Sequence, residues 1–372
     1  MKVLHLSKYY KPYKGGIEQV VQDLCEASVK HGVISSVLCV NHEDFNNVSN
    51  IDGITVYRCK AQLVMSSAPV SIDYLLTFRR IVHEYDIIHV HLPNPLASLA
   101  LMLANLNGKK VVLHWHSDIV KQNILKYFYS PIQSWTLRIA DSIIATSKIY
   151  AEQSDILPFY SSKVSVIPIG IEPLVPCPQI TKSLNQDYND RKIVFALGRH
   201  VYYKGFEYLI DAMRYLDDEY LLLIGGVGEL TNNYIGLVSE YSLKDKVKFL
   251  GRIPEEKISS YFQAANVFCL PSIERSEAFG VVQIESFSVG TPVVSTSIER
   301  SGVSWVNANS ISGLVVPPRD SKSLANAIIK CCTDLNEACS QGALSRFENF
   351  FHKDIMVENT VKLYNDVLKD LK

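Results

Sequence analysis

The chain alternates between short, continuous apolar runs and longer segments in which apolar residues recur every three or four positions. The segment at residues 17–30 is typical of the longer kind, because its apolar residues follow a helical spacing up to Gly32. In the first half, apolar runs typical of buried strands lie at residues 2–6, 36–40, 54–58, 87–91, 111–116, 143–147 and 164–169. Buried strands that alternate with helices indicate a parallel sheet covered on both faces. The first half is therefore predicted to be a doubly wound α/β domain.

The alternation stops and restarts in the middle of the chain. Residues 173–192 begin with a proline-rich run and continue as a polar stretch without apolar periodicity, which indicates a linker. Apolar runs then return at residues 193–198, 220–226, 247–251, 267–270, 292–296 and 313–317. We expect two Rossmann-like domains, at residues 1–172 and 193–352, that face a cleft where ligands bind at the carboxyl ends of the strands. Residues 353–372 are predicted to form a closing helix that could cross back to the first domain.

Composition and charge exclude several classes of protein. The 372 residues are 47% hydrophobic and 20% charged with a net charge of −1, which is typical of a globular protein that does not bind nucleic acid. The eight cysteines form no C-x-x-C pair, so we expect reduced core residues. The first apolar run ends too early for a signal peptide, and the run at residues 96–106 is too short to cross a bilayer. We expect a cytoplasmic protein, and contact with the cytoplasmic face of the inner membrane stays compatible with this.

One loop and helix contain two carboxylates, Glu277 and Glu285, eight residues apart. A helix that starts between them would leave the amides of Phe279, Gly280 and Val281 free to bind an anion such as a diphosphate. Eight helical residues span roughly 12 Å, so the two carboxylates could hold opposite ends of one extended ligand but not one atom. The alternative is that both are solvated acids on a helix surface.

Two loops of the second half offer further groups for a phosphate or nucleotide. Arg199 and Lys204 follow the first strand, and their charges suit a diphosphate, although both could be ordinary surface cations. Gly228 belongs to the run Gly-Gly-Val-Gly-Glu at residues 225–229, which could face a nucleotide. Thr231 replaces the third glycine of G-x-G-x-x-G and no P-loop occurs, so a redox cofactor is not supported.

In the first half, paired glycines stand where a helix is predicted to start. The backbone amides at Gly15 and Gly16 could face an anion or a sugar, and a bare turn is the alternative.

Four histidines occupy alternate positions in two predicted strands. His89 and His91 should share one face of their strand, as should His114 and His116. They suggest a metal site, but they have no accompanying carboxylate or cysteine cluster and the chain has no D-x-D spacing, so we expect no metal. We expect His116 to form hydrogen bonds in the cleft, and a packed histidine at a strand end is the alternative.

Residues 121–138 mix lysine and arginine with aromatic and aliphatic residues. This mixture is typical of a helix that lies on an anionic membrane or contacts a lipid-linked acceptor. A core-facing helix with extended cationic side chains fits equally well.

Taken together, these motifs resemble the retaining GT-B glycosyltransferases of family 4, over residues 2–320. The most specific part is the E-x7-E segment from Glu277 to Glu285, followed by Gly-Thr-Pro-Val-Val-Ser at residues 290–295. The Gly-Gly-Ile-Glu-Gln run at residues 15–19 looks like mannosyltransferases and related enzymes of bacterial O-antigen or capsule assembly.

The resemblance implies roles for the residues that match the family motifs. Glu285 would hold the ribose hydroxyls and Glu277 the sugar hydroxyls of the donor, while the amides at residues 279–281 hold phosphate. Arg199 and Lys204 would neutralise the leaving diphosphate in place of a metal.

The resemblance also implies a base-binding segment and a contribution from the first domain. Arg252 and Ile253 would border the base, and Gly16 and His116 would approach the donor. The family's front-face mechanism, in which the leaving phosphate helps to deprotonate the acceptor, requires no nucleophilic residue.

The expected activity is transfer of a hexose from a nucleotide diphosphate sugar to a lipid-linked glycan with retention of configuration, in bacterial surface polysaccharide assembly. GDP-mannose and a UDP-sugar are both possible donors, with mannose favoured. A nucleotide-sugar epimerase or phosphorylase of the same fold, and a non-catalytic nucleotide-binding subunit, are the alternatives.

Overall fold

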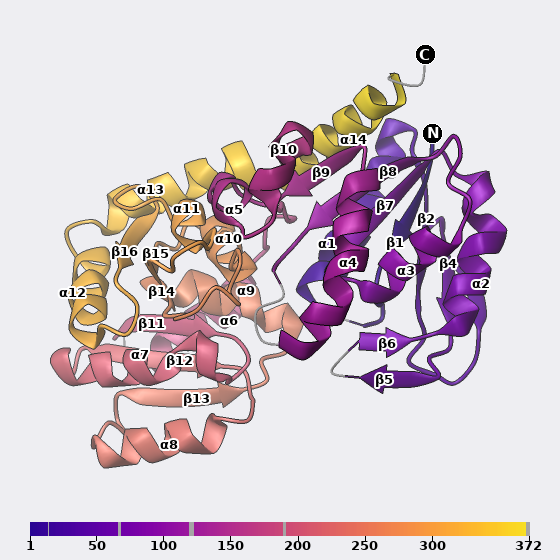
Figure 1. The fold of residues 1–372 in the computed structure, drawn as a ribbon. Helices are drawn as coiled ribbons and strands as arrows, with labels where there is room; N and C mark the ends of the chain where they lie inside the picture. The colour runs from indigo at the N-terminus through magenta and orange to yellow at the C-terminus, as the bar shows by residue number, and fades with distance from the viewer. Residues whose placement is uncertain (14, 66–67, 119–122, 189–190, 370–372) are drawn as a thin grey trace. The chain divides into compact units, whose positions relative to one another are not determined.

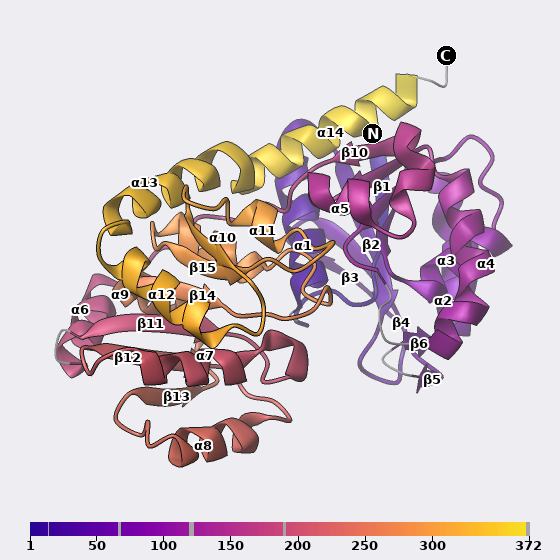
Figure 2. The same cartoon turned by 60° about the vertical axis from the view of Figure 1, so that its left-hand side comes forward.

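The computed structural model describes residues 1–13, 15–65, 68–118, 123–188 and 191–369, which divide into two compact units. The first unit comprises Met1–Gly170 together with the C-terminal segment from Lys353, and the second comprises Ile171–His352. Each unit has a central sheet with helices on both faces (Figures 1 and 2).

The sheet of the first unit has the strand order β10-β9-β8-β7-β1-β2-β4-β3. Its strands are β1 (Lys2–Leu6), β2 (Ile34–Val40), β3 (Asn47–Ile51), β4 (Ile54–Cys59), β7 (Ile87–Leu92), β8 (Lys110–Trp115), β9 (Ser142–Ala145) and β10 (Val164–Val166). Neighbouring strands pair in parallel except β3, which is antiparallel to β4. Strands β5 (Leu63–Met65) and β6 (Ala68–Val70) form a separate antiparallel pair. The strand order reverses between β1 and β7, which is the switch point where doubly wound sheets bind ligands.

The helices of the first unit form two layers. They are α1 (Gly16–Ser28), α2 (Ile72–Ile81), α3 (Pro95–Leu103), α4 (Asn123–Ile139), α5 (Lys148–Gln153) and α14 (Lys353–Lys369). Helix α1 packs against α14, whereas α3 packs against both α2 and α4. The helix α14 therefore belongs to the first unit although it ends the chain. Val21 and Cys25 of α1 pack with Val37 and Cys39 of β2 and with Ile54 of β4, which places the core of this layer over β2 and β4.

The sheet of the second unit is parallel throughout and has the order β13-β12-β11-β14-β15-β16. Its strands are β11 (Lys192–Leu197), β12 (Tyr220–Gly225), β13 (Val247–Gly251), β14 (Val267–Leu270), β15 (Val293–Thr296) and β16 (Gly313–Val316). All residues of β12, β14 and β15 are buried, as expected for strands covered on both faces. The order reverses between β11 and β14, so the loops after these two strands meet at the switch point.

The helices of the second unit cover the two faces with different cores. They are α6 (Pro178–Asp187), α7 (Phe206–Ala212), α8 (Thr231–Glu240), α9 (Glu255–Ala264), α10 (Val281–Ser288), α11 (Val303–Val306), α12 (Ser321–Cys332) and α13 (Asn336–Arg346). Helix α7 contacts α8 and α12 over a mainly aliphatic core, while α9 contacts α6 and α10. On the α9 face the rings of Phe195, Phe262 and Phe268 pack against one another.

The predicted fold class, two doubly wound parallel sheets, is confirmed. The linker prediction differs from the structure, because α6 occupies half of residues 173–192 and packs on α9 within the second unit. Its apolar pattern consists of Ile180 and the buried Leu184, one turn apart, which is too short to be read as a helix. Strand β3 was not predicted either, since this edge strand is largely exposed and has no apolar run.

Across the helices that the structure describes, none combines a membrane-spanning length with sufficient apolar character.

Candidate active site

Lys204 and Glu277 form an ion pair at the switch point of the second sheet. Lys204 ends the short 3-10 turn η4 (Tyr202–Lys204) after β11, and Glu277 lies in the loop after β14. The Nζ atom of Lys204 is 2.6 Å from Oε2 of Glu277, and the two side chains are only 11% and 12% exposed. The structure therefore brings together two residues that the sequence predicts for the donor site.

Gly205 allows the loops after β11 and β14 to approach closely. Its φ of +64° lies in the left-handed region, and a Cβ atom there would lie 2.3 Å from the carbonyl oxygen of Pro271. The amide of Ile273 donates to the carbonyl of Tyr203 at 2.8 Å and joins the two loops. Lys204 is consequently fixed next to Glu277 by the backbone on both sides.

Glu277 has further hydrogen bonds that fix its position. The Ser272 hydroxyl donates to Oε2 of Glu277 at 3.1 Å, and the Ser301 hydroxyl donates to the Glu277 carbonyl. The Glu277 amide donates to the carbonyl of Glu274 at 3.0 Å. These hydrogen bonds thus orient both the backbone and the carboxylate of Glu277.

Glu285 lies one turn into α10 and has an unusual protonation equilibrium. Burial raises the pKa of Glu285 to about 7, although the positive charge of Lys204 opposes the shift. Part of the Glu285 side chain stays accessible, so solvent limits this shift. The influence of Lys204 links Glu285 electrostatically to the ion pair.

Helix α10 starts with Gly280 in the left-handed conformation, at a φ of +75°. A Cβ atom at Gly280 would lie 2.7 Å from Cδ2 of Leu270 and 2.9 Å from the side-chain nitrogen Nε2 of Gln283. Phe279 is buried beside it, and the amides at residues 279–281 lie at the helix start, where intrahelical partners are missing. This geometry suits a phosphate next to Lys204.

Arg199 differs from Lys204 in its surroundings. Its side chain is exposed, and its guanidinium nitrogen lies 3.5 Å from the Tyr203 hydroxyl, at the limit of a hydrogen bond. The structure does not bring Arg199 into the ion pair of Lys204.

The glycines after β12 have a structural role that the sequence did not reveal. A Cβ atom at Gly226 would lie 1.9 Å from the carbonyl oxygen of Gly198, and one at Gly228 would lie 2.4 Å from that of His200. The His200 amide donates to Val227 at 3.2 Å across the same contact. These glycines let two loops pack backbone to backbone, which is independent of any nucleotide.

The predicted base-binding pair lies after β13. Arg252 is exposed, whereas Ile253 is half-buried against Gly225. A Cβ atom at Gly225 would lie 2.6 Å from Cδ1 of Ile253, so this side chain fills the space that the glycine leaves.

In the first unit, the start of α1 is already next to a carboxylate. Gly15 precedes the helix in an extended conformation, and a Cβ atom there would lie 2.2 Å from Oε2 of Glu18. Burial raises the pKa of Glu18, an effect opposed by its own backbone amide and by Lys8. Gly16 is exposed, and a Cβ atom there would meet nothing within 4 Å. An anion at this helix start would have to displace Glu18, which belongs to the Gly-Gly-Ile-Glu-Gln run but had no predicted role.

The predicted histidine pairs share one face of the first sheet, and a fifth histidine joins them. His91 is paired in register with His114, and His89 is paired with His5 of β1. Residues two positions apart in a strand share a face, so all five histidine rings, including that of His116, project to the same side of the sheet. The Tyr364 hydroxyl of α14 hydrogen-bonds Nδ1 of His89, which places this face under α14. Sequence reasoning missed His5 because the lateral register of β1 and β7 is not visible in the chain.

Burial keeps these histidines neutral. It lowers the pKa of His5 and of His116 to about 3, and it lowers the pKa of His89, His91 and His114 well below the usual value, with neighbouring imidazoles adding to the shift. All five side chains are at most 6% exposed.

The same cluster brings nitrogen atoms close enough to consider a metal. In the groups His5, His89, His91 and His91, His114, His116, the possible ligand atoms lie within 4.8 Å of one another. The rings are stacked, with only 5° between the planes of His89 and His91 and 13° between those of His114 and His116. A metal lies in the plane of each imidazole that binds it, so nearly parallel stacked rings do not direct their lone pairs to one point. The described side chains fit hydrogen bonds between rings better than a metal centre.

Helix α4 contains most of the segment predicted to contact a membrane. Its Tyr129 is buried, with the hydroxyl 2.9 Å from that of Ser98, whereas Tyr127 and Arg138 are exposed. The side chains of Lys121 and Lys126 lie outside the described residues. The described part of α4 thus has a core-facing side and an exposed side.

Both halves of the chain match known glycosyltransferase families. Residues 14–173 match the family described as Glycosyltransferase Family 4, and residues 180–345 match Glycosyl transferases group 1. D-rhamnosyltransferase WbpZ of Pseudomonas aeruginosa is 33% identical over 332 residues, which cover 88% of this chain and 86% of that protein. O-antigen chain mannosyltransferase C of Escherichia coli is 32% identical over 375 residues, which cover 99% of each chain.

Solved structures agree with this assignment at the level of the fold. Sucrose-phosphate synthase from Thermosynechococcus elongatus matches with a TM-score of 0.79 at 23% identity, over 99% of each chain. Anabaena Alr3699/HepE in complex with UDP also matches with a TM-score of 0.79 at 21% identity, over 98% of this chain and 100% of that one. The chain therefore belongs to the family 4 glycosyltransferases and has the GT-B fold.

Proposed function

We propose that this glycosyltransferase transfers a hexose from a nucleotide diphosphate sugar to a lipid-linked glycan, with retention of the anomeric configuration. Mannose is the favoured sugar, because the O-antigen chain mannosyltransferase aligns with almost the whole chain. The same similarity supports a place in the assembly of a bacterial surface polysaccharide. A GDP-linked and a UDP-linked donor both fit this proposal.

The observation that carries the proposal is the ion pair of Lys204 and Glu277 beside Glu285 at the switch point. In a doubly wound sheet, this position is where nucleotides bind. The diphosphate would bind the amides at residues 279–281 and compete with Glu277 for the ammonium group of Lys204. Glu277 would then be available to accept hydrogen bonds from the sugar hydroxyls, while Glu285 holds those of the ribose.

Cations would stabilise the negative charge that develops on the diphosphate when its bond to the sugar breaks. As the bond from the anomeric carbon to the phosphate oxygen breaks, its electron pair stays on the departing diphosphate. Lys204 would stabilise this charge directly, with Arg199 as a second cation and no metal requirement. On the same face of the sugar, the acceptor hydroxyl would attack and pass its proton to the leaving phosphate, so we assign no nucleophilic residue.

The remaining groups are proposed to complete binding. Gly228, Arg252 and Ile253 would border the nucleotide, and Gly16 and His116 would contribute hydrogen-bonding groups from the first unit, with Gly15 at the same helix start. The exposed side of α4 is proposed to contact the cytoplasmic face of the inner membrane, where a lipid-linked acceptor would be available.

The test combines binding with product analysis. Thermal unfolding with GDP, UDP, ADP and dTDP should identify one stabilising nucleotide. The matching nucleotide sugar is then incubated with membrane extract as the source of acceptor, and Lys204→Ala protein serves as the inactive control. Mass spectrometry should show one added hexose on the acceptor, and NMR coupling constants should show the donor's anomeric configuration.

Other products would contradict the proposal in distinct ways. Epimerised sugar or free nucleotide diphosphate from donor alone would indicate an epimerase or another non-transferase enzyme. Donor binding without turnover in any extract would indicate a non-catalytic subunit. An inverted anomeric centre would leave a transferase but exclude the retaining mechanism.

A further inference from the structure

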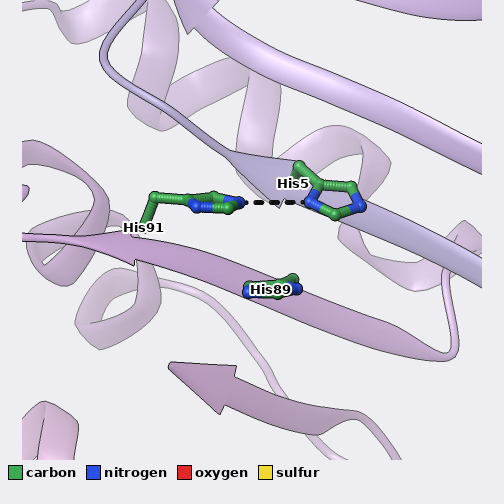
Figure 3. A group of neighbouring side chains, drawn as sticks. All are labelled: His5, His89 and His91. Carbon is green, nitrogen blue, oxygen red and sulfur yellow. Dashed lines mark hydrogen bonds between the residues drawn. The ribbon is translucent and has the colours of Figure 1, made fainter. Parts of the chain in front are cut away.

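Three buried histidines form a continuous chain of hydrogen bonds across the first sheet. The Nε2 atom of His116 is 3.0 Å from Nδ1 of His91, and Nε2 of His91 is 3.2 Å from Nδ1 of His5. Figure 3 shows the bond between His5 and His91, with the ring of His89 beside them but outside the chain. The middle ring, His91, therefore uses opposite nitrogens for its two neighbours.

The chain leads to the end of the sheet where ligands bind. His5 is opposite His89 in register, and His91 lies two residues beyond His89 toward the carboxyl end of β7. His91 is in turn opposite His114, and His116 lies two residues beyond that, just after the end of β8. Each step moves one strand across and two residues toward the carboxyl edge, where a ligand of this unit would bind.

Neutral imidazoles restrict how such a chain can be protonated. A neutral ring has one N–H donor and one bare nitrogen acceptor, so each bond needs a donor on one ring and an acceptor on the next. Two arrangements satisfy both bonds: His5, His91 and His116 are all protonated at Nε2, or all are protonated at Nδ1. The tautomers of the three residues are therefore coupled.

The outer nitrogens of the chain favour one of these arrangements. Among the described residues, Nδ1 of His116 is buried without a hydrogen-bond partner. A buried N–H group without a partner is rarer than a buried acceptor without one. The lower-energy arrangement leaves Nδ1 of His116 as a bare acceptor and places the N–H groups at Nε2.

We propose that His5 and His91 are positioning residues that hold His116 in the Nε2–H tautomer, so that its Nδ1 lone pair accepts a hydrogen bond from a sugar hydroxyl. This inference rests on the proposed function for the identity of the ligand, but the coupling of tautomers does not. A lone pair at this position selects a hydroxyl over a phosphate oxygen, because a phosphate oxygen only accepts. His5, a residue of the central strand β1, would thus influence a ligand contact two rings away.

The test uses NMR of the full chain labelled with 15N-histidine, at a pH where the rings are neutral. Long-range 1H–15N spectra distinguish the two tautomers, and His116→Gln and His91→Gln variants assign the signals. In the unsubstituted protein, His5, His91 and His116 should all be Nε2–H tautomers. Mixed tautomers among the three would overturn the proposal, and this result requires no variant of His5 to fold.

The variant His5→Leu provides the decisive comparison. Without an acceptor at residue 5, the Nε2–H group of His91 loses its partner. Both arrangements then leave one buried N–H group unpaired, so His116 should change from the single Nε2–H tautomer to a mixture of the two tautomers. The matched control is His114→Leu, because His114 stacks on His116 with ring centroids 4.2 Å apart but neither of its nitrogens has a hydrogen bond among the described residues. An unchanged His116 signal in folded His5→Leu protein, or an equal change in His114→Leu protein, would overturn the proposal.

The test of the histidine chain is separate from the test of the proposed function. The spectra need no substrate, so loss of tautomer coupling and loss of transferase activity are independent outcomes. Metal analysis of the purified protein should show no stoichiometric zinc, since a bound metal would use the lone pairs that join the rings.

Discussion

Lys204 and Glu277 meet at 2.6 Å although they follow strands that are distant in sequence, β11 and β14. Both side chains are largely buried. In the proposed function, a diphosphate that enters this site would share Lys204 with Glu277, and the exchange would release a carboxylate for the sugar. The ion pair would then prepare both groups for one ligand.

Replacement of Lys204 by alanine should lower kcat by roughly 10² to 10³, because the leaving diphosphate would lose its nearest cation. Steady-state kinetics with the cognate donor measure this effect. The matched control is Lys192→Ala, which removes a lysine of β11 whose ion pair with Glu219 is at the surface. Turnover of Lys204→Ala equal to that of the control variant would contradict the assigned role.

Arg199→Ala separates a role in binding from a role in stability. Arg199 is exposed in the ligand-free structure, so its removal should leave the unfolding temperature unchanged. If the bound diphosphate recruits this arginine, kcat should still fall by roughly 10² to 10³. Full turnover would show that Lys204 acts without it.

The protonation of Glu285 should make the ligand-free protein lose stability as the pH rises. Burial raises the pKa of Glu285 to about 7 from an unfolded value of 4.5, so the folded state binds more protons between these two values. Stability then falls with increasing pH across this window and levels off above it. Thermal unfolding from pH 4.5 to 8 should show a smaller decrease for Glu285→Gln than for the unsubstituted protein.

A surface substitution controls for general effects of charge. Glu240→Gln changes an exposed residue at the end of α8 and should follow the unsubstituted protein. The Glu285→Gln variant should also bind nucleotide more weakly, since an amide replaces the carboxylate proposed to hold the ribose. Parallel pH curves for both variants would show that Glu285 does not carry the linkage.

The sequence predicted the two sheets and the loops that contain Lys204 and Glu277, because buried strands and glycine-bounded loops are local signals. It did not predict the ion pair, since the adjacency of β11 and β14 depends on strand order. The interpretation of Gly226 and Gly228 as nucleotide-facing was incomplete for a similar reason. Their contacts with the backbone of Gly198 and His200 join two loops that are distant in the chain.

The first unit shows the same limit. Alternate positions were enough to place His114 and His116 on one face of a strand, but His5 joins them only through lateral register. At the start of α1, the paired glycines suggested an open anion site, whereas the carboxylate of Glu18 folds back toward Gly15. The spacing of residues in the sequence shows which chemical groups an element carries. The packing of side chains decides which of these groups a ligand can reach.

Transferase activity should survive removal of divalent metals. In the proposed function Lys204 neutralises the diphosphate in place of a metal, and the sequence has no D-x-D motif to bind one. Activity in excess EDTA should equal activity in buffer, as measured by release of nucleotide diphosphate. Complete loss with EDTA and recovery with Mn²⁺ would contradict metal-free transfer.

Gly205→Ala should damage stability and turnover together. The left-handed φ of +64° disfavours alanine, and the new methyl group would lie 2.3 Å from the carbonyl oxygen of Pro271. We expect the free energy of unfolding to fall by about 1–3 kcal/mol or more, and kcat to fall because the loop that holds Lys204 must shift.

Gly236→Ala is the matched control, because Gly236 lies within α8 and a Cβ atom there meets nothing within 4 Å. This variant should gain roughly 0.5–1 kcal/mol from the higher helix propensity of alanine and retain full activity. Chemical denaturation and donor kinetics on both variants test the pair, and equal stability of the two would show that the contact between Gly205 and Pro271 does not constrain the loop.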